Sequence, residues 1–402
     1  MHAPAPAEAR IDGNSNLLVA SSPPIEDFFG TTITPEGLAS GPPDLAGKTV
    51  YLCGDLSAID PRHLHAAARV FVVRELSHGY AADSPWPLVG LGRVPVRVHG
   101  VGVHYRRFFD PGADHFGRIG AEHEFQSLTE STKPGTAHRS GIYLTPVTRD
   151  GDDLRFHLLR CSTNLSGPTE GFRPTDTAVV DALNREAATV FQGHAPLNHV
   201  LAQIYHNTPA APGRKQSKAK ISAHADKTKD MPANGVMAFC TFYDRLDKLQ
   251  PLAEDPFDHG LKGVSGLTKL HFRRKDPTAA PHDTALPAQF TVPLHPGSVF
   301  FMPLSTNRLY THEIRSSMLD AELLPTRLGY VVRCSNTEAV HRAGRTFLQL
   351  TDGLVPLEPP TQAGLDELRG LYAEENRTTS SIDYGDRFRF SMNTGDYLAP
   401  RA

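Results

Sequence analysis

The chain has 402 residues, of which 39% are hydrophobic and 21% are charged, enough for a sizeable core under an ordinary soluble surface. Its 41 basic and 44 acidic residues give a formal net charge of −3, which argues against a nucleic-acid-binding domain with a clearly basic surface. The first residues contain no apolar signal-peptide core, and no apolar run is long enough to cross a bilayer. We therefore expect a cytoplasmic protein without a membrane partner.

The four cysteines lie far apart, and none forms a C-x-x-C pair. This spacing favours neither a zinc knuckle nor a disulfide framework. We expect buried free thiols, in a reducing compartment, at Cys53, Cys161, Cys240 and Cys334.

The N-terminal half is expected to contain two parts. Residues 1–45 are rich in Pro, Ala, Gly and Ser, which predicts a loose arm. Residues 46–175 are expected to form a β-rich region packed on the core that could bind substrate. Short runs rich in β-branched and aromatic residues predict its strands, at 49–56, 70–76, 94–105, 141–147 and 154–161.

The catalytic core is expected at 176–340. It opens with a helix over about 176–192, capped by Thr175 or Asp176, with one apolar face. Turn signals then separate eight strand candidates, at 199–207, 218–226, 236–243, 268–274, 289–296, 298–304, 309–315 and 328–335. Eight such strands predict a double-stranded β-helix, or jelly roll, in a mainly β fold with flanking helices (α+β). The polar stretch 244–267 reads as an insertion, and 341–402 as a C-terminal helix (about 363–376) with a tail.

An H-x-D tripeptide, His224-Ala225-Asp226, ends one of these strands. Strand alternation puts His224 and Asp226 on the same face, where both can reach one ion. In a chain with 20 histidines, about one such tripeptide is expected by chance, so alone it is better interpreted as a polar strand end exposed to water.

His312 changes that interpretation. A non-haem iron(II) oxygenase needs two histidines and one carboxylate, which leave three positions open on the metal. His312 follows an apolar strand later in the same roll and fits as the third ligand. Arg327 and Arg333 then lie on one face of the next strand. A buried guanidinium needs an anion such as the distal carboxylate of 2-oxoglutarate; a structural ion pair is the alternative.

Residues 197–340 resemble the AlkB-like branch of the iron(II)/2-oxoglutarate-dependent dioxygenases. The matching segments, in order, are 198–205 with Gln203 and Tyr205, Pro212-Gly213, 219–227 with the H-x-D, 296–314 with His312, and Arg327 to Arg333. Gln203 stands where that family has Asn, and the interval from Asp226 to His312 is longer than the family's. Residues 1–175 and 340–402 carry no such resemblance.

The resemblance implies an enzyme, an Fe(II)/2-oxoglutarate-dependent dioxygenase. It implies that His224, Asp226 and His312 bind Fe(II), and that Tyr205, Gln203, Arg327 and Arg333 bind 2-oxoglutarate. O2 would convert 2-oxoglutarate to succinate and CO2 while hydrogen is removed from a C–H bond of the substrate. Halogenating relatives replace the carboxylate ligand with a small residue. Because Asp226 is present, we expect hydroxylation, demethylation, desaturation or oxidative cyclisation.

Three functions remain open at this point. We expect a small metabolite carrying a carboxylate, such as an amino acid, with His138 and Arg139 in the polar segment 122–140 as candidate substrate contacts. The resemblance alternatively suggests demethylation of N-methylated nucleobases, which basic clusters at 214–229 and 269–275 favour but the net charge opposes. A cupin-like metal-binding protein without oxygenase activity is the third possibility, and it would not need Arg327.

Overall fold

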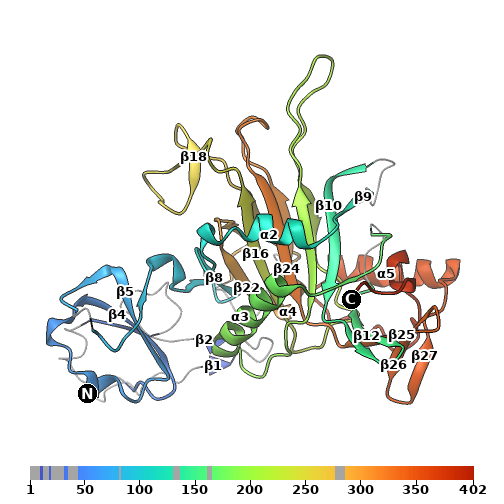
Figure 1. The fold of residues 1–402 in the computed structure, drawn as a ribbon, viewed down its shortest axis with the longest axis horizontal. Helices are drawn as coiled ribbons and strands as arrows, with labels where there is room; N and C mark the ends of the chain where they lie inside the picture. Colours follow the sequence, from blue (N-terminus) through green and yellow to red (C-terminus); the bar gives the residue numbers. More distant parts are fainter. Residues whose placement is uncertain are drawn as a thin grey trace.

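The structure, a computed structural model, describes residues 10–11, 18–19, 31–34, 44–80, 83–129, 136–160, 165–276 and 286–402. Most elements in these ranges are strands, which confirms the expected mainly β class with flanking helices (Figure 1). Cys53, Cys240 and Cys334 are buried free thiols as predicted, whereas Cys161 lies outside the described residues. None of the helices described here is long and apolar enough to cross a membrane.

A parallel sheet forms the N-terminal lobe, to the left in Figure 1. Its strands, in spatial order, are β3 (Thr31–Ile33), β4 (Thr49–Asp55), β5 (Arg69–His78) and β6 (Leu88–Val89). Successive side chains of β4 enter different apolar clusters, Tyr51 on one face and Leu52 on the other. β3 belongs to the segment expected to be a loose arm, as does a short pair formed by β1 (Arg10–Ile11) and β2 (Leu18–Val19).

The core contains all eight predicted strands, in two sheets. The larger sheet has the order β13 (Glu170–Gly171), β10 (Thr136–Thr145), β14 (His199–Tyr205), β24 (Thr326–Arg333), β16 (Val236–Asp244), β22 (Val299–Pro303), β8 (Gly102–Tyr105) and β7 (Val96–Val98), with β9 (Gln126–Thr129) paired to β10. The smaller sheet has the order β15 (Ile221–His224), β23 (Tyr310–Arg315), β20 (Lys269–Arg274) and β21 (Gln289–Pro293). Along the chain the strands pass repeatedly between the two sheets, which is the topology of a jelly roll.

Strand alternation gives the larger sheet two apolar faces. One face packs, through residues such as Ala238 and Tyr330, against α2 (His115–Glu122) and α3 (Pro174–Val190). The other face packs, through residues such as Met237 and Phe300, against the smaller sheet. The larger sheet is therefore the middle layer, with helices on one face and the smaller sheet on the other.

The remaining elements flank this core. The expected insertion carries a small sheet of β17 (Gln250–Pro251), β18 (His259–Leu261) and β19 (Val264–Ser265). A second sheet, on the right in Figure 1, contains β11 (Thr148–Asp150), β12 (Asp153–Leu158), β25 (Thr337–Arg342), β26 (Arg345–Leu350) and β27 (Gly353–Pro356). The short helix α4 (Leu304–Leu309) precedes β23, and α5 (Gln362–Arg377) is the predicted C-terminal helix.

The start of α3 differs from the sequence expectation. The helix begins at Pro174, and Arg173 occupies the N-cap position, so neither Thr175 nor Asp176 is the cap. Proline suits the first helical position because its missing N–H needs no partner there. Asp176 instead accepts a hydrogen bond from the Arg173 backbone N (2.8 Å) and a second from the Tyr330 hydroxyl (2.8 Å).

Asp176 belongs to a buried ionic cluster around His123, at the end of α2. The imidazole Nε2 lies 2.6 Å from Asp176 Oδ2, and Nδ1 lies 2.9 Å from Glu170 Oε2. Two carboxylates can both accept only from the doubly protonated ring. Burial alone would lower the pKa of His123, but hydrogen bonds and charge attraction from Asp176 and Glu170 raise it. His123, part of the segment expected to touch substrate, instead joins α2, α3 and β13.

This cluster predicts a pH-dependent contribution to stability. A histidine with a raised folded-state pKa contributes fully below its unfolded pKa of about 6.5 and loses that contribution as the pH rises through the folded value. Urea unfolding of the wild-type protein between pH 6 and 9 should therefore show the free energy of unfolding falling by up to about 1.4 kcal/mol per pH unit in that window. The His123→Gln variant should lack this decrease. A wild-type free energy of unfolding that rises between pH 6 and 9 would contradict the raised pKa of His123.

Candidate metal centre and co-substrate cavity

The H-x-D segment begins at the last residue of β15, an edge strand of the smaller sheet. β15 ends at His224, which lies opposite His312 of β23 in the strand register. Directly opposed residues on paired strands bring their side chains together, and the two imidazole centroids are 4.5 Å apart. Asp226 follows two residues later, beyond the end of the strand.

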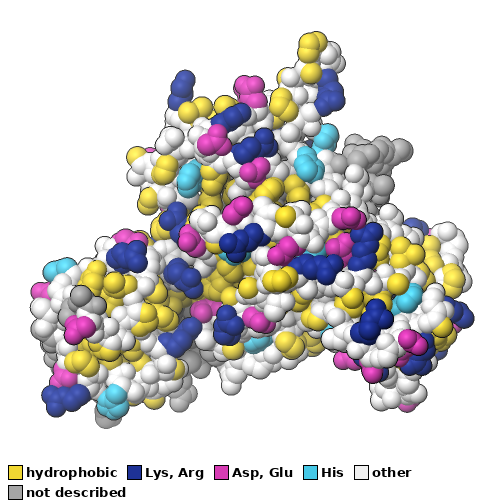
Figure 2. All heavy atoms as spheres, in the orientation of Figure 1, with side chains coloured by type: hydrophobic (Ala, Val, Ile, Leu, Met, Phe, Trp, Pro, Cys, Tyr) yellow, Lys and Arg dark blue, Asp and Glu magenta, His cyan; other side chains and the backbone are white. Residues whose placement is uncertain are grey.

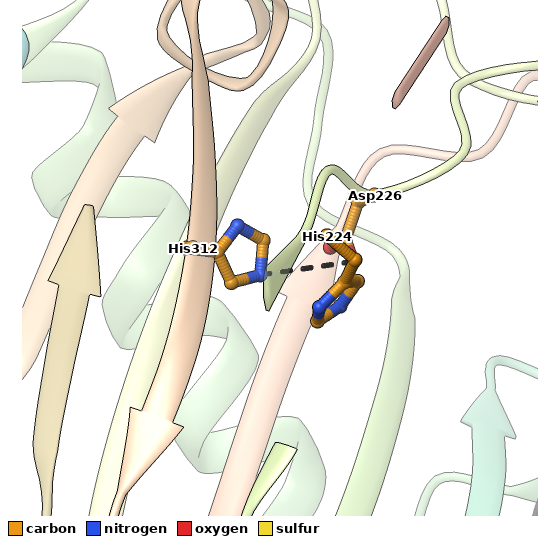
Figure 3. A group of neighbouring side chains, drawn as sticks. All are labelled: His224, Asp226 and His312. Carbon is orange, nitrogen blue, oxygen red and sulfur yellow. Dashed lines mark ion pairs between the residues drawn. The ribbon is translucent and has the colours of Figure 1, made fainter. Parts of the chain in front are cut away.

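The three predicted ligand side chains converge from β15, the segment after it, and β23 (Figure 3). Asp226 Oδ1 lies 3.5 Å from His224 Nε2 and 4.0 Å from His312 Nε2. His224 donates its Nδ1–H to the Ser222 carbonyl (2.9 Å), a bond that leaves the lone pair on Nε2. The donor atoms that face one another are therefore two imidazole nitrogens and one carboxylate oxygen.

Arg333 fixes the Asp226 carboxylate. Its Nε and Nη2 both contact Oδ2, at 3.0 and 2.7 Å, so Oδ1 is the oxygen turned towards the histidines. Burial would raise the pKa of Asp226, but Arg333 first and the two histidines next hold it well below its usual range. Asn307 of α4 binds both backbone groups of Asp226, at 2.8 Å each. The carboxylate is thus ionised and fixed in direction.

His312 lies in an apolar environment. The rings of Phe239 and Phe272 lie 5.5 and 5.7 Å from its own, and burial together with the nearby His224 lowers its pKa to about 3. Its Nδ1 is buried and has no hydrogen-bond partner among the described residues. The other ring nitrogen, Nε2, is the one that faces Asp226, and a neutral imidazole can offer a lone pair there.

These residues fit a divalent transition metal. Donors bound to one ion at about 2.1 Å would lie about 3 Å apart, so the spacings from Asp226 would have to shorten by roughly 0.5 and 1 Å. The set of two histidines and one carboxylate suits iron(II) with positions left open. The fit rests on the ionised, directed carboxylate and on the two imidazole Nε2 atoms that face it.

A cavity of about 460 Å³ extends from this cluster between the two sheets. Across the larger sheet, Arg139, Tyr205 and Arg327 are register neighbours on adjacent strands, and all three line the cavity. The Arg327 guanidinium lies over the Tyr205 ring, 3.9 Å from its centroid, and the Tyr205 hydroxyl donates to Gln203 Oε1 (3.2 Å). Neither Nε nor Nη2 of Arg327 has a hydrogen-bond partner among the described residues, although both are buried.

An unpaired buried cation is costly, so the placement of Arg327 favours an anion in this cavity. Thr241 is a further candidate that the sequence did not indicate, since its buried Oγ1 also lacks a described partner and the residue lines the cavity. The sequence predicted Arg327, Tyr205 and Gln203 as one group, and the three side chains contact one another in the cavity lining. Their contact with a co-substrate stays a prediction.

Gly329 makes room for the Arg327 side chain. A Cβ built at Gly329 would lie 2.8 Å from Arg327 Nη1 and 3.1 Å from the Tyr205 ring. We expect Gly329→Ala to displace the guanidinium and weaken 2-oxoglutarate binding about tenfold, which corresponds to about 1.4 kcal/mol. Overall stability should change little, because the displaced atom is the end of a flexible side chain.

Titration of the metal–2-oxoglutarate absorption band measures this effect, and urea unfolding measures the stability. Gly370→Ala on α5 is the control, because its Cβ would meet nothing within 4 Å. Equal 2-oxoglutarate affinity in the Gly329→Ala variant and the wild type would exclude the proposed place of the co-substrate.

Two predicted residues are placed differently from the expectation. Arg139 lines the cavity, but alternation along β10 turns its neighbour His138 to the other face of the strand, where it is exposed. Arg333 faces the cavity as expected but binds Asp226, because six residues of extended chain, about 20 Å, separate it from Arg327.

The fold and the site define a jelly-roll protein with a His–Asp–His cluster at one end of a cationic cavity. No protein-family model matches the chain, and no curated protein matches its sequence. Matching solved structures include a Pseudomonas putida prolyl-4-hydroxylase, with 11% identity, 58% of this chain and 91% of that chain covered, and a TM-score of 0.31. OsALKBH1 matches with 13% identity, 56% and 92% coverage, and a TM-score of 0.30.

A third similar structure is the non-heme alpha ketoglutarate dependent epimerase SnoN from nogalamycin biosynthesis. It has 15% identity, 65% of this chain and 89% of that chain covered, and a TM-score of 0.31. These similarities are distant, so the function has to be inferred from this chain's own residues.

Proposed function

We propose that this protein is an Fe(II)- and 2-oxoglutarate-dependent oxygenase that acts on a small metabolite carrying a carboxylate, such as an amino acid. The proposal rests on one cavity that contains both a set of metal-ligand side chains and a buried arginine without an anion among the described residues. At one end is a His224–Asp226–His312 donor set, and at the other a buried arginine, Arg327, without an anion. A protein that only bound a metal would not need the second feature.

Iron(II) bound there would use O2 to convert 2-oxoglutarate to succinate and CO2 and would oxidise a C–H bond of the substrate. The protein residues prepare the site for this. Arg333 turns one oxygen of Asp226 towards the histidines, and Ser222 sets the tautomer of His224. Arg327, with Tyr205 beside it, binds the distal carboxylate of 2-oxoglutarate, and Gln203 orients the Tyr205 hydroxyl. We assign Arg333 to Asp226 instead of to the co-substrate.

The charge of the cavity supports an anionic substrate. Its lining contains one carboxylate, that of Asp226, and five cationic side chains, those of Arg139, Lys220, Lys227, Arg327 and Arg333. Arg333 is neutralised by Asp226, and Arg327 would be neutralised by 2-oxoglutarate. The other cationic side chains of the lining favour a second anion. Hydroxylation, desaturation or oxidative cyclisation of a carboxylic acid fits this excess of positive charge in the cavity.

Demethylation of N-methylated nucleobases is the second candidate, supported by the basic residues near the cavity mouth. Three of the predicted basic residues have other partners: Lys229 pairs with Asp230 in the interior, Lys218 binds the Ser317 carbonyl, and Lys275 binds the Glu375 carbonyl. Acidic and basic side chains alternate on the face shown in Figure 2 and form no continuous basic track there. A phosphate backbone would favour such a track.

Anaerobic addition of Fe(II) and 2-oxoglutarate tests the proposal. A metal-to-ligand charge-transfer band is expected, and in air 2-oxoglutarate should be converted to succinate faster when the correct substrate is present. Correctly folded protein without the band would overturn the oxygenase assignment. Stimulation by methylated oligonucleotides, and by no carboxylic acid, would replace the first candidate with the second.

A further inference from the structure

The segment that carries Asp226 is held by side chains instead of by strand pairing. β15 ends at His224, so the backbone N–H groups that follow have no partner in the sheet. Asn376 Oδ1 accepts from Ala225 N (2.7 Å), Asn307 Oδ1 from Asp226 N (2.8 Å), and Glu375 from Thr228 N (3.2 Å). Two of these three residues come from the C-terminal end of α5.

α5 is therefore part of the site, which its sequence pattern did not indicate. Glu375 is itself anchored by the Tyr384 hydroxyl (2.6 Å), and its carbonyl accepts from Lys275 Nζ (2.7 Å). Tyr372 and Asn376, one turn apart on the same face of α5, both line the cavity. The helix thus forms a wall beside the segment that joins His224 to Asp226.

The hydrogen bond from Ala225 determines which group Asn376 presents to the cavity. Ala225 N is a donor, so the atom it meets is the carbonyl oxygen of the amide, and this fixes the flip of the side chain. The Nδ2 group then points away from that bond, and no described residue accepts a hydrogen bond from it. An amide donor is therefore available directly beside the metal ligands.

Lys227 provides a charge at the same place. It follows Asp226 immediately, lines the cavity, and its Nζ lies 4.6 Å from the centroid of the Tyr372 ring. Tyr372 is one turn from Asn376, so an ammonium and an amide N–H2 belong to the same wall of the cavity. Such a pair is suited to an oxyanion with two oxygens, because hydrogen bonds to charged groups are the stronger ones.

We propose that Asn376 is a specificity-determining residue whose Nδ2, together with Lys227 Nζ, binds a carboxylate of the substrate beside the metal. Its Oδ1 has a separate role and positions Ala225 between the two ligands of the H-x-D. This proposal rests on the proposed function and adds the place of substrate recognition. The carbon atoms nearest the bound carboxylate are then those that face the metal.

Asn376→Asp and Asn376→Ala separate the two roles. Aspartate keeps an oxygen that accepts from Ala225 N but replaces the amide donor with a negative charge. Alanine removes both groups. We expect Asn376→Asp to bind Co(II) and 2-oxoglutarate as the wild type does, and Asn376→Ala to bind Co(II) about 10- to 100-fold more weakly, as is typical when a partner of a ligand segment is lost.

Acetate is the probe for the carboxylate site. In the anaerobic Co(II)–2-oxoglutarate complex, the wild-type protein should enhance the relaxation of the acetate methyl protons through the nearby paramagnetic ion. Asn376→Asp and Lys227→Met should reduce this enhancement at least tenfold. Gln362→Glu, the same amide-to-carboxylate change at the exposed start of α5, is the matched control and should leave it unchanged.

The outcomes distinguish this inference from the function on which it rests. A wild-type protein that binds Co(II) and 2-oxoglutarate but does not relax acetate, or an Asn376→Asp variant that relaxes it equally, would overturn the carboxylate site and leave the oxygenase proposal intact. Folded wild-type protein that fails to bind Co(II) with 2-oxoglutarate would overturn both.

Discussion

Replacing His312 with leucine is expected to abolish the Fe(II)–2-oxoglutarate band and succinate formation while leaving the metal-free protein at least as stable as the wild type. The imidazole is buried among Phe239 and Phe272, its pKa is lowered to about 3, and its Nδ1 has no described partner. Leucine has a similar size and removes a buried polar atom that makes no hydrogen bond. A site residue kept at a cost in stability is characteristic of function.

Thermal unfolding with and without Fe(II) measures both parts of this expectation. The wild-type protein should gain stability on adding metal, because only the folded state holds the three ligands together, and His312→Leu should gain none. His271→Leu is the control: this histidine is on neighbouring β20 and contacts Thr291 outside the cavity (2.8 Å). A His312→Leu variant that keeps the band would eliminate His312 as a ligand.

Arg333→Met is expected to give the largest loss of stability, about 3–5 kcal/mol in the metal-free protein, because it leaves the buried Asp226 carboxylate without its cation. A bound divalent ion would neutralise the same carboxylate. The variant should therefore depend on metal for stability more strongly than the wild type does. Urea unfolding in chelator and in excess Co(II) gives the two values to compare.

The double variant Arg333→Met with Asp226→Asn provides the control. Replacing both partners removes the unpaired charge, so most of the lost stability should return in chelator. Metal binding should not return, because an amide is a poor substitute for the anionic ligand. If Arg333→Met alone is as stable as the wild type without metal, the pair does not hold the carboxylate as described.

The parts of this molecule that follow from local patterns could be predicted from the sequence. Eight core strands and the shared face of Arg327 and Arg333 follow from the period-two alternation of strands. Alternation also brought His224 and Asp226 together in the prediction, although Asp226 lies beyond the end of β15. The order of these segments along the chain also brought His312 into the same prediction. The prediction for the cap of α3 was wrong because it overlooked Pro174, whose ring suits the first helical position and so places the cap at Arg173.

The groups that hold the ligand segment have no local sequence signal. Asn376 and Glu375 lie about 150 residues after the H-x-D on an amphipathic helix, and both accept from backbone N–H groups that any residue except proline could provide. His138 was proposed because it lies in the polar segment 122–140, and strand alternation turns it away from the cavity.

The core begins and ends on neighbouring strands, since β14 pairs with β24 along its whole length. β14 therefore has one partner, β10, that precedes it in the chain, whereas its second partner, β24, is made only after all the other core strands. The strands that carry His224 and His312 are likewise distant in the chain. Proteins dominated by such non-local pairings fold slowly. Metal capture should accordingly be among the last events of folding, and the rate at which the iron band appears during refolding would report completion of the whole roll.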